Sequence, residues 1–241
     1  MVIGFNVVEA SRVNGVKKLM NLGSTCIYPK MAQQPIKEES LLTGSLEPTN
    51  DAYALAKISV IKLCTAYNKQ HGTNFLSVMP TNLYGPGDNY DLAGSHVLPA
   101  MIRKFDDAKK SGRDEVVLWG DGSPLREFLY SEDLADAVVF LMEERDAKDL
   151  LPESFVNVGT GKECTIKQIA LMVRDVVYAD VPGRDCRIVW DASKPNGTPR
   201  KLCDVSKLKA LGWEAKMPLE RGLRLSYQDY LAGGGTMSKR Q

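Results

Sequence analysis

The sequence predicts an α/β fold built on a doubly wound parallel sheet, with a smaller α/β lobe towards the C-terminus. Two apolar runs, at 16–23 and 75–79, have the length and bounding residues of buried strands. The segment between them, from about 51 to 70, has helical periodicity. A strand, a helix and a second strand in this order indicate a parallel pair with a crossover helix. After residue 95 the elements become shorter and mixed, which favours a separate lobe.

The first element predicted is a helix, because apolar residues recur at helical spacing at Ile3, Val7 and Ala10. Asn14-Gly15 then supplies a stop signal. The strand at 16–23 follows and ends at Gly23-Ser24. A long polar loop with three prolines leads to the next helix.

The helix at about 51–70 carries two apolar stripes. One consists of Ala56, Val60, Leu63 and Tyr67, and the other of Leu55, Ile58 and Ile61. Two stripes predict a helix covered on both sides. The strand at 75–79 comes next and is closed by a turn-rich run, 84–88.

The remaining elements alternate. We expect helices around 97–110, from Ser131, after the capping box 165–168 and around 219–227, and strands at 116–119, 155–158 and 186–190. The predicted domains are a main domain over 1–95, a lobe over 96–232 with some segments returning to the main sheet, and a flexible tail over 233–241.

Composition argues against several classes of function. The 241 residues include 31 Lys and Arg and 30 Asp and Glu, so the net charge of +1 gives no reason to expect a nucleic-acid partner. Five scattered cysteines without a C-x-x-C pair and two histidines favour neither a metal site nor a disulfide framework. With no membrane-length apolar run and no secretory signal, we expect a cytoplasmic protein that does not contact a membrane.

The residues that indicate chemistry are Tyr53 and Lys57, which lie four apart on one face of the predicted helix. A tyrosine hydroxyl, with an ordinary pKa of about 10, transfers protons poorly at neutral pH, but a neighbouring ammonium stabilises its phenolate. Ser24 ends a buried strand, where parallel sheets place functional groups. Tyr-x-x-x-Lys alone is more often a pair on a surface helix.

Seven segments change that estimate. They are 23–29 (GSTCIYP), 47–57 (EPTNDAYALAK), 80–86 (PTNLYGP), 95–99 (SHVLP), 119–128 (WGDGSPLREF), 157–161 (NVGTG) and 191–201 (DASKPNGTPRK). In this order they resemble the extended short-chain dehydrogenase/reductase family, and within it the GDP-L-fucose synthases. The resemblance covers nearly the whole chain and implies a Rossmann-like main domain with a substrate-binding lobe.

The resemblance implies an enzyme that converts GDP-4-keto-6-deoxy-D-mannose to GDP-L-fucose with NADPH. Ser24, Tyr53 and Lys57 would be the reduction triad for the C4 ketone. Cys26 and His96 would be the acid/base pair that epimerises C3 and C5, where the ketone acidifies the neighbouring protons. Read alone, Cys26 is more often an inert core thiol, and His96 a hydrogen-bonded loop residue.

The resemblance also implies the binding residues. NADP(H) would contact Tyr53, Lys57, Pro80, Asn82, Leu83 and His96, and the GDP-sugar would contact Asn82, Lys104, Trp119, Arg126 and Lys201. Arginine and lysine suit a diphosphate, although each basic residue in isolation is more often a solvated surface charge. The other four cysteines and His71 match no role.

One part of the family pattern is missing. Enzymes of this class begin with a strand and a glycine-rich turn that holds the cofactor pyrophosphate, and this sequence has none. Gly159-Thr160-Gly161 lacks the third glycine, and in the family it belongs to the substrate side. The resemblance implies that on the order of 80 residues of strand–helix units are absent, which would leave an exposed edge on the strand at 16–23.

Two alternatives therefore stay open beside an active epimerase-reductase. The chain could be a non-catalytic nucleotide-sugar-binding protein or the dimer partner of a homologue. It could also be another NAD(P)-dependent sugar-nucleotide epimerase or dehydratase. The resemblance implies a homodimer through the helices at 2–13 and 51–70.

Overall fold

The computed structural model describes residues 1–181, 183 and 185–235, which form two compact units. The first comprises Met1–Thr81, Asp133–Lys162 and Lys201–Ala215, and the second comprises the other described residues. The first segment of the first unit thus ends at Thr81, whereas the sequence predicts a main domain over 1–95, and the chain returns to this unit twice.

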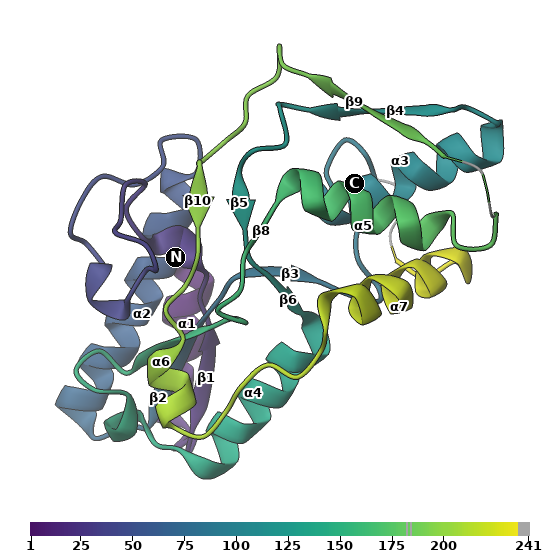
Figure 1. Ribbon diagram of the computed structural model, residues 1–241. Helices are drawn as coiled ribbons and strands as arrows, with labels where there is room; N and C mark the ends of the chain where they lie inside the picture. Colours follow the sequence, from purple (N-terminus) through teal and green to yellow (C-terminus); the bar gives the residue numbers. More distant parts are fainter. Residues whose placement is uncertain (182, 184, 236–241) are drawn as a thin grey trace. The chain divides into compact units, whose positions relative to one another are not determined.

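A three-stranded parallel sheet is the centre of the first unit (Figure 1). Its strands are β1 (Leu19–Leu22), β2 (Phe75–Pro80) and β7 (Phe155–Val158), in the order β1-β2-β7. Every residue of β2 and β7 is buried, as expected for strands of a parallel sheet covered on both faces. The predicted parallel sheet is confirmed, and within the described residues β1 lies at its edge.

The helices of the first unit are α1 (Val2–Val13), α2 (Asp51–His71), α4 (Ser131–Glu144, whose first turn precedes the unit boundary) and the short α6 (Ser206–Ala210). The first two lie close to their predicted positions and α4 begins at the predicted residue, whereas α6 was not predicted. Three 3-10 turns, η1 (Thr25–Ile27), η2 (Glu38–Ser40) and η3 (Ala147–Leu150), were not predicted. Gly72 ends α2 in the left-handed conformation, which glycine adopts without strain.

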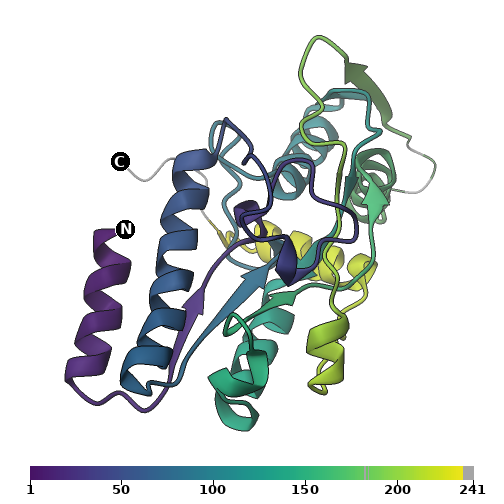
Figure 2. The ribbon, with the colours of Figure 1, turned by 90° about the vertical axis from the view of Figure 1, so that its left-hand side faces the viewer.

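Helix α2 is covered on two sides, as its two stripes predict. Ile58 and Ile61 pack in a cluster with Ile27 and Met79, whereas Val60, Leu63 and Tyr67 belong to a second cluster around Val8 of α1, Cys64 and Phe75. Figure 2 shows α1 and α2 lying side by side. Leu55 was wrongly assigned to a covered stripe, since it is 47% exposed.

The second unit is built from three helices and several short strands. Its elements are β3 (Asn82–Tyr84), α3 (Val97–Ser111), β4 (Glu115–Trp119), β5 (Leu125–Arg126), β6 (Phe128–Tyr130), β8 (Cys164–Thr165), α5 (Ile166–Val177), β9 (Arg187–Asp191) and α7 (Leu219–Leu231). Strand β3 pairs with β6 and β4 with β9, both in parallel, while β5 and β8 are antiparallel. The two-residue strand β10 (Arg200–Lys201) lies where the chain passes from the second unit to the first.

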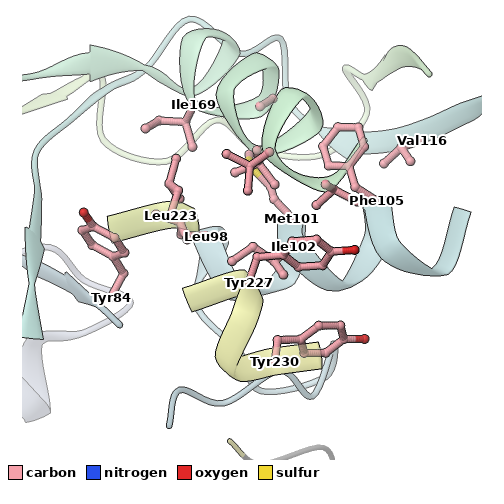
Figure 3. Close-up of a cluster of buried hydrophobic side chains, with 14 of the residues drawn as sticks. Tyr84, Leu98, Met101, Ile102, Phe105, Val116, Ile169, Leu223, Tyr227 and Tyr230 are labelled. Atoms are coloured by element: carbon pink, nitrogen blue, oxygen red, sulfur yellow. The ribbon is translucent and has the colours of Figure 1, made fainter. Parts of the chain in front are cut away.

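A large hydrophobic core holds the second unit together. Phe105 and Ile102 of α3 pack against residues of α5, and Leu223 and Tyr227 of α7 join them (Figure 3). The Tyr227 hydroxyl is at 2.9 Å from a carboxylate oxygen of Asp106 in the same core. This unit therefore has an apolar interior of its own, which fixes the strands that carry candidate substrate residues.

The loop between β1 and α2 is not only a polar surface loop, as the sequence suggested. Ile27, Tyr28, Ile36 and Glu38 are buried in it, because the 3-10 turns direct them towards α2 and β7. At the other end of the chain, the Gly233 and Gly234 amides donate to main-chain carbonyls of α7. The rest of the predicted tail, 236–241, lies outside the described residues.

In the part of the chain that the structure describes, no helix combines the length and the apolar character needed to cross a membrane.

Candidate active site

The carboxyl end of β1 carries the first group of candidate residues. The chain leaves β1 through Gly23, whose amide donates to the Val78 carbonyl at 2.8 Å. Ser24 then caps η1, and its hydroxyl accepts the Cys26 amide at 3.2 Å. A side chain at Gly23 would meet the Met79 side chain at 2.4 Å, so glycine lets the backbone pass close to β2.

Tyr53 and Lys57 lie on one face of α2, as their spacing predicts. The Lys57 ammonium lies 5.6 Å from the centre of the Tyr53 ring and donates to the Leu22 carbonyl at 2.7 Å. This hydrogen bond ties the first turns of α2 to the last residue of β1. Tyr53 is 46% exposed. Pro80, the last residue of β2, is buried one strand further on.

Cys26 lies in η1 and is partly exposed. The Lys201 ammonium lies 3.5 Å from its sulfur. The two residues are 175 positions apart in the sequence. The structure therefore brings the candidate epimerisation thiol next to a lysine that the sequence assigned to substrate binding.

A buried polar network supports the loop behind η1. Tyr28 donates to the Asn157 side-chain oxygen at 2.5 Å, and the Asn157 amide nitrogen of the main chain donates to Glu38 at 2.9 Å. Burial raises the pKa of both Tyr28 and Glu38. Tyr28 and Asn157 lie in the quoted segments 23–29 and 157–161, but their separation of 129 positions gives no local signal that they meet.

The second unit carries the other candidate residues, and Trp119 at the end of β4 is the most exposed of the aromatic ones, at 64%. Two ammonium groups lie over its ring, those of Lys104 at 5.9 Å and Lys194 at 5.8 Å from the ring centre. Burial lowers the pKa of Lys104, which also donates to the Val117 carbonyl. Lys194 was missed, although it lies in the quoted segment 191–201.

Arg126 and Asn82 are held by main-chain carbonyls. Arg126 of β5 donates to the Leu125 carbonyl at 2.8 Å, and burial lowers its pKa. Asn82 of β3 donates through its side chain to the Glu127 carbonyl at 2.8 Å. Leu83, the next residue of β3, is half-buried.

His96 precedes the first turn of α3 as its N-cap residue and is exposed. Its charged neighbour in the second unit is Asp88. Burial raises the pKa of Asp88, and the proximity of His96 partly offsets this effect. Asp88 was not among the residues singled out in the sequence.

The other four cysteines and His71 are the residues to which the sequence assigns no role. Cys64, Cys186 and Cys203 are buried, and Cys164 is half-buried in β8. His71, at the end of α2, packs edge-on against the Tyr67 ring.

Comparison with known proteins identifies relatives over most of the chain. Residues 1–180 match the model of the NAD dependent epimerase/dehydratase family. The chain is 55% identical over 227 residues to the probable GDP-L-fucose synthase 1 of Oryza sativa, covering 94% of this chain and 66% of the relative. It is 50% identical to the GDP-L-fucose synthase of Escherichia coli over 235 residues, which are 96% of this chain and 72% of that protein.

Two solved structures of related proteins are similar to this chain in fold. A GDP-L-fucose synthetase from Naegleria fowleri bound to NADP superposes with a TM-score of 0.85 at 31% identity, covering 95% of this chain and 71% of that one. A GDP-6-OMe-4-keto-L-xylo-heptose reductase from Campylobacter jejuni gives a TM-score of 0.87 at 34% identity, covering 96% and 75%. The chain thus spans about two thirds to three quarters of the length of the proteins it resembles.

Proposed function

Because the chain belongs to the NAD dependent epimerase/dehydratase family, we propose that it carries the catalytic residues of a GDP-L-fucose synthase. The proposed reaction converts GDP-4-keto-6-deoxy-D-mannose to GDP-L-fucose by epimerisation at C3 and C5 and reduction at C4. The names of the relatives in Oryza sativa and Escherichia coli support this choice.

The observation that carries the proposal is the arrangement at the end of β1. The Lys57 ammonium donates to the Leu22 carbonyl and lies beside the Tyr53 ring. Ser24 lies two residues after Leu22, the last residue of β1. A cation near a tyrosine favours the phenolate, and a serine hydroxyl can share the same ketone oxygen. In the proposed reduction, Tyr53 donates a proton to the C4 oxygen while Ser24 hydrogen-bonds that oxygen.

The residues present fit the nicotinamide end of NADP(H). Lys57 and Pro80 lie at the carboxyl ends of neighbouring parallel strands, where such sheets bind cofactors. Lys57 and Tyr53 would hold the nicotinamide ribose, and Asn82, Leu83 and His96 would contact the same cofactor. The bound cofactor supplies the hydride for the C4 carbon. The NADP-bound relative supports this choice of cofactor.

For the sugar nucleotide, we assign the diphosphate and base to residues of the second unit. Trp119 offers an exposed flat ring flanked by two ammonium groups, which suits a base or sugar next to a diphosphate. Arg126, Lys104 and Asn82 supply further donors, and Lys201 is a candidate contact from the first unit. Cys26 and His96 are proposed to remove and return the protons at C3 and C5.

The test separates the two half-reactions. The protein is incubated with the keto-sugar nucleotide in D2O, and deuterium at C3 and C5 is measured by NMR, while NADPH oxidation is followed by absorbance. Cys26→Ser should lose at least about 100-fold of the exchange rate. Tyr53→Phe should lose NADPH oxidation by a similar factor and keep the exchange.

The GDP-L-fucose synthase of Escherichia coli is assayed in parallel as the positive control for both readouts. Binding of the sugar nucleotide to this chain without exchange or oxidation would favour the non-catalytic alternative. Exchange that survives both Cys26→Ser and His96→Asn would favour another epimerase or dehydratase.

We also propose that the protein is a homodimer through α1 and α2. Apolar side chains on these helices are exposed, namely Val2 at 73%, Ile3 at 81%, Phe5 at 52% and Leu55 at 47%. Exposed apolar surface of this kind marks association sites. Light scattering should give a dimer for the wild type and a monomer for Phe5→Glu, whereas a wild-type monomer contradicts the proposal.

A cytoplasmic location completes the proposal, because all five cysteines are thiols, as is usual in a reducing compartment. Cell fractionation with an antibody to the protein tests it.

A further inference from the structure

The contact between Lys201 and Cys26 joins two distant parts of the first unit. The Lys201 ammonium lies 3.5 Å from the Cys26 sulfur, within hydrogen-bonding distance for a sulfur acceptor. Both side chains are only partly buried, so added salt still reaches the pair and screens its interaction. In the described part of the chain, no carboxylate lies within ion-pair distance of Lys201.

The main chain holds this contact in place from both sides. After Lys201, the Leu202 amide donates to the Gln34 side chain and the Leu202 carbonyl accepts the Ile36 amide, each at 2.8 Å. The Asp204 amide then donates to the Ile36 carbonyl at 2.8 Å. On the other side, the Ser24 hydroxyl fixes the Cys26 amide. Hydrogen bonds therefore fix the main chain next to the lysine and next to the thiol, so that the two side chains leave the backbone close to each other.

The neighbouring arginine, Arg200, has a different partner. Its Nε donates to both carboxylate oxygens of Glu163, each at 2.9 Å. The Lys201 ammonium instead contacts the Cys26 sulfur.

A thiol needs to ionise before it can act as a base or a nucleophile. A positive charge close to the sulfur favours the thiolate over the neutral thiol. An ammonium also has protons to donate to the sulfur, and it keeps them when the thiolate takes a proton from carbon.

We propose that Lys201 is a positioning residue that contacts the Cys26 sulfur and favours its thiolate form, the form that abstracts a proton. In the epimerisation step, the C–H bond next to the ketone breaks, an S–H bond forms on Cys26, and the electron pair moves into an enolate. Lys201 transfers no proton in this step. The catalytic consequence rests on the proposed function, whereas the charge pairing does not.

The pairing is tested by alkylation with iodoacetamide, a neutral reagent that the lysine does not attract. Short pulses near neutral pH are followed by mass spectrometry of the Cys26 peptide. Lys201→Gln should slow alkylation of Cys26 by at least about fivefold, and Lys201→Arg should stay within about twofold of the wild type. Arg200→Gln is the matched control at the neighbouring position and should leave the rate unchanged.

Salt provides a readout that a merely structural lysine would not move. Raising the ionic strength should slow alkylation of wild-type Cys26 and leave Lys201→Gln unaffected, because only the wild type has a charge pair to screen. Equal rates for wild type and Lys201→Gln overturn the proposal. The proposal is also overturned if Lys201→Gln and Lys201→Arg slow alkylation equally, because the effect would then not depend on the positive charge.

Folding is checked in the same samples, since Cys64 and Cys203 are 0% and 1% exposed and stay unlabelled in a folded protein. If Cys64 and Cys203 are labelled in Lys201→Gln, that variant is not folded and the salt dependence of the wild type becomes the test. A wild-type alkylation rate that salt does not change then overturns the pairing. The alkylation needs neither substrate nor cofactor. A failure of the proposed enzymatic function would instead leave the thiol result intact and abolish deuterium exchange.

Discussion

Glu38 is a carboxylic acid in the interior of the first unit, where it is 7% exposed and accepts the Asn157 main-chain amide. Burial raises its pKa above the usual value of 4.5. A raised pKa means that the folded state binds the proton more tightly than the unfolded state does. The contribution of Glu38 to stability is therefore complete below about pH 4 and is lost as the pH rises through its folded pKa.

Glu38→Gln should remove this loss, because the amide oxygen still accepts the Asn157 hydrogen bond and carries no charge. We expect the variant to be more stable than the wild type at neutral pH, with the difference shrinking as the pH falls. Urea unfolding across the pH range measures it. Glu39→Gln, at an exposed neighbouring position, is the control and should follow the wild type. Parallel pH curves for Glu38→Gln and wild type would contradict the expectation.

The spacing of residues along the sequence predicts some side-chain contacts and misses others. Tyr53 and Lys57 lie on one helical turn, so their proximity follows from the geometry of the helix. The contact between Cys26 and Lys201 depends on strand pairing between the 34–36 loop and the segment after Lys201. No periodicity in the sequence encodes such a pairing.

The contact between α1 and α2 depends on a close approach at Gly4. A β-carbon at this position would lie 2.4 Å from a methyl group of Val60. Valine is stiff at its first side-chain torsion, so it cannot turn away easily. Alanine improves helix propensity by about 0.5–1 kcal/mol, but overpacking costs about 1–3 kcal/mol.

We therefore expect Gly4→Ala to lower the free energy of unfolding and to weaken the protection of α1 amides in hydrogen exchange. Val60→Ala removes the methyl groups that the new side chain would meet. The double variant should recover part of the loss, which a double-mutant cycle from urea unfolding measures. A Gly4→Ala protein more stable than the wild type would show that α1 yields without cost.

Elements of 12 residues or more could be predicted because they show several repeats of a helical pattern. The capping box Thr165–Gln168 was predicted and is present, with both reciprocal hydrogen bonds. The short strands β3, β5, β6, β8 and β10 have two or three residues, too few to show alternation. They form because partners distant in the sequence pair with them.

The organisation of the whole molecule was harder to derive than its fold class. A parallel α/β arrangement follows from the order of strands and helices, and it is confirmed. The second and third segments of the first unit, Asp133–Lys162 and Lys201–Ala215, carry no local signal of where they belong. Their membership depends on packing, since β7 enters the sheet beside β2.

The five thiols are distributed over both units and differ in reactivity. Burial raises the pKa of Cys64 and of the half-buried Cys164 to about 11. At neutral pH a thiol of that pKa is thiolate in only about one part in 10,000. The Glu163 carboxylate also contributes to the raised pKa of Cys164. Cys26 is partly exposed like Cys164, but its neighbour is the Lys201 ammonium.

We therefore expect Cys26 to be alkylated first in the folded protein, with Cys164 well behind despite its similar exposure class. Cys64, Cys186 and Cys203 should react only after unfolding, because they are almost fully buried. Quantitative peptide mass spectrometry after graded labelling measures the order, and labelling in concentrated urea, where all five rates should converge, is the control. Along a urea series, labelling of Cys64 reports the opening of the first unit and labelling of Cys186 that of the second. Equal rates for Cys164 and Cys26 in the native protein would contradict the assignment of distinct electrostatic surroundings to these two sulfurs.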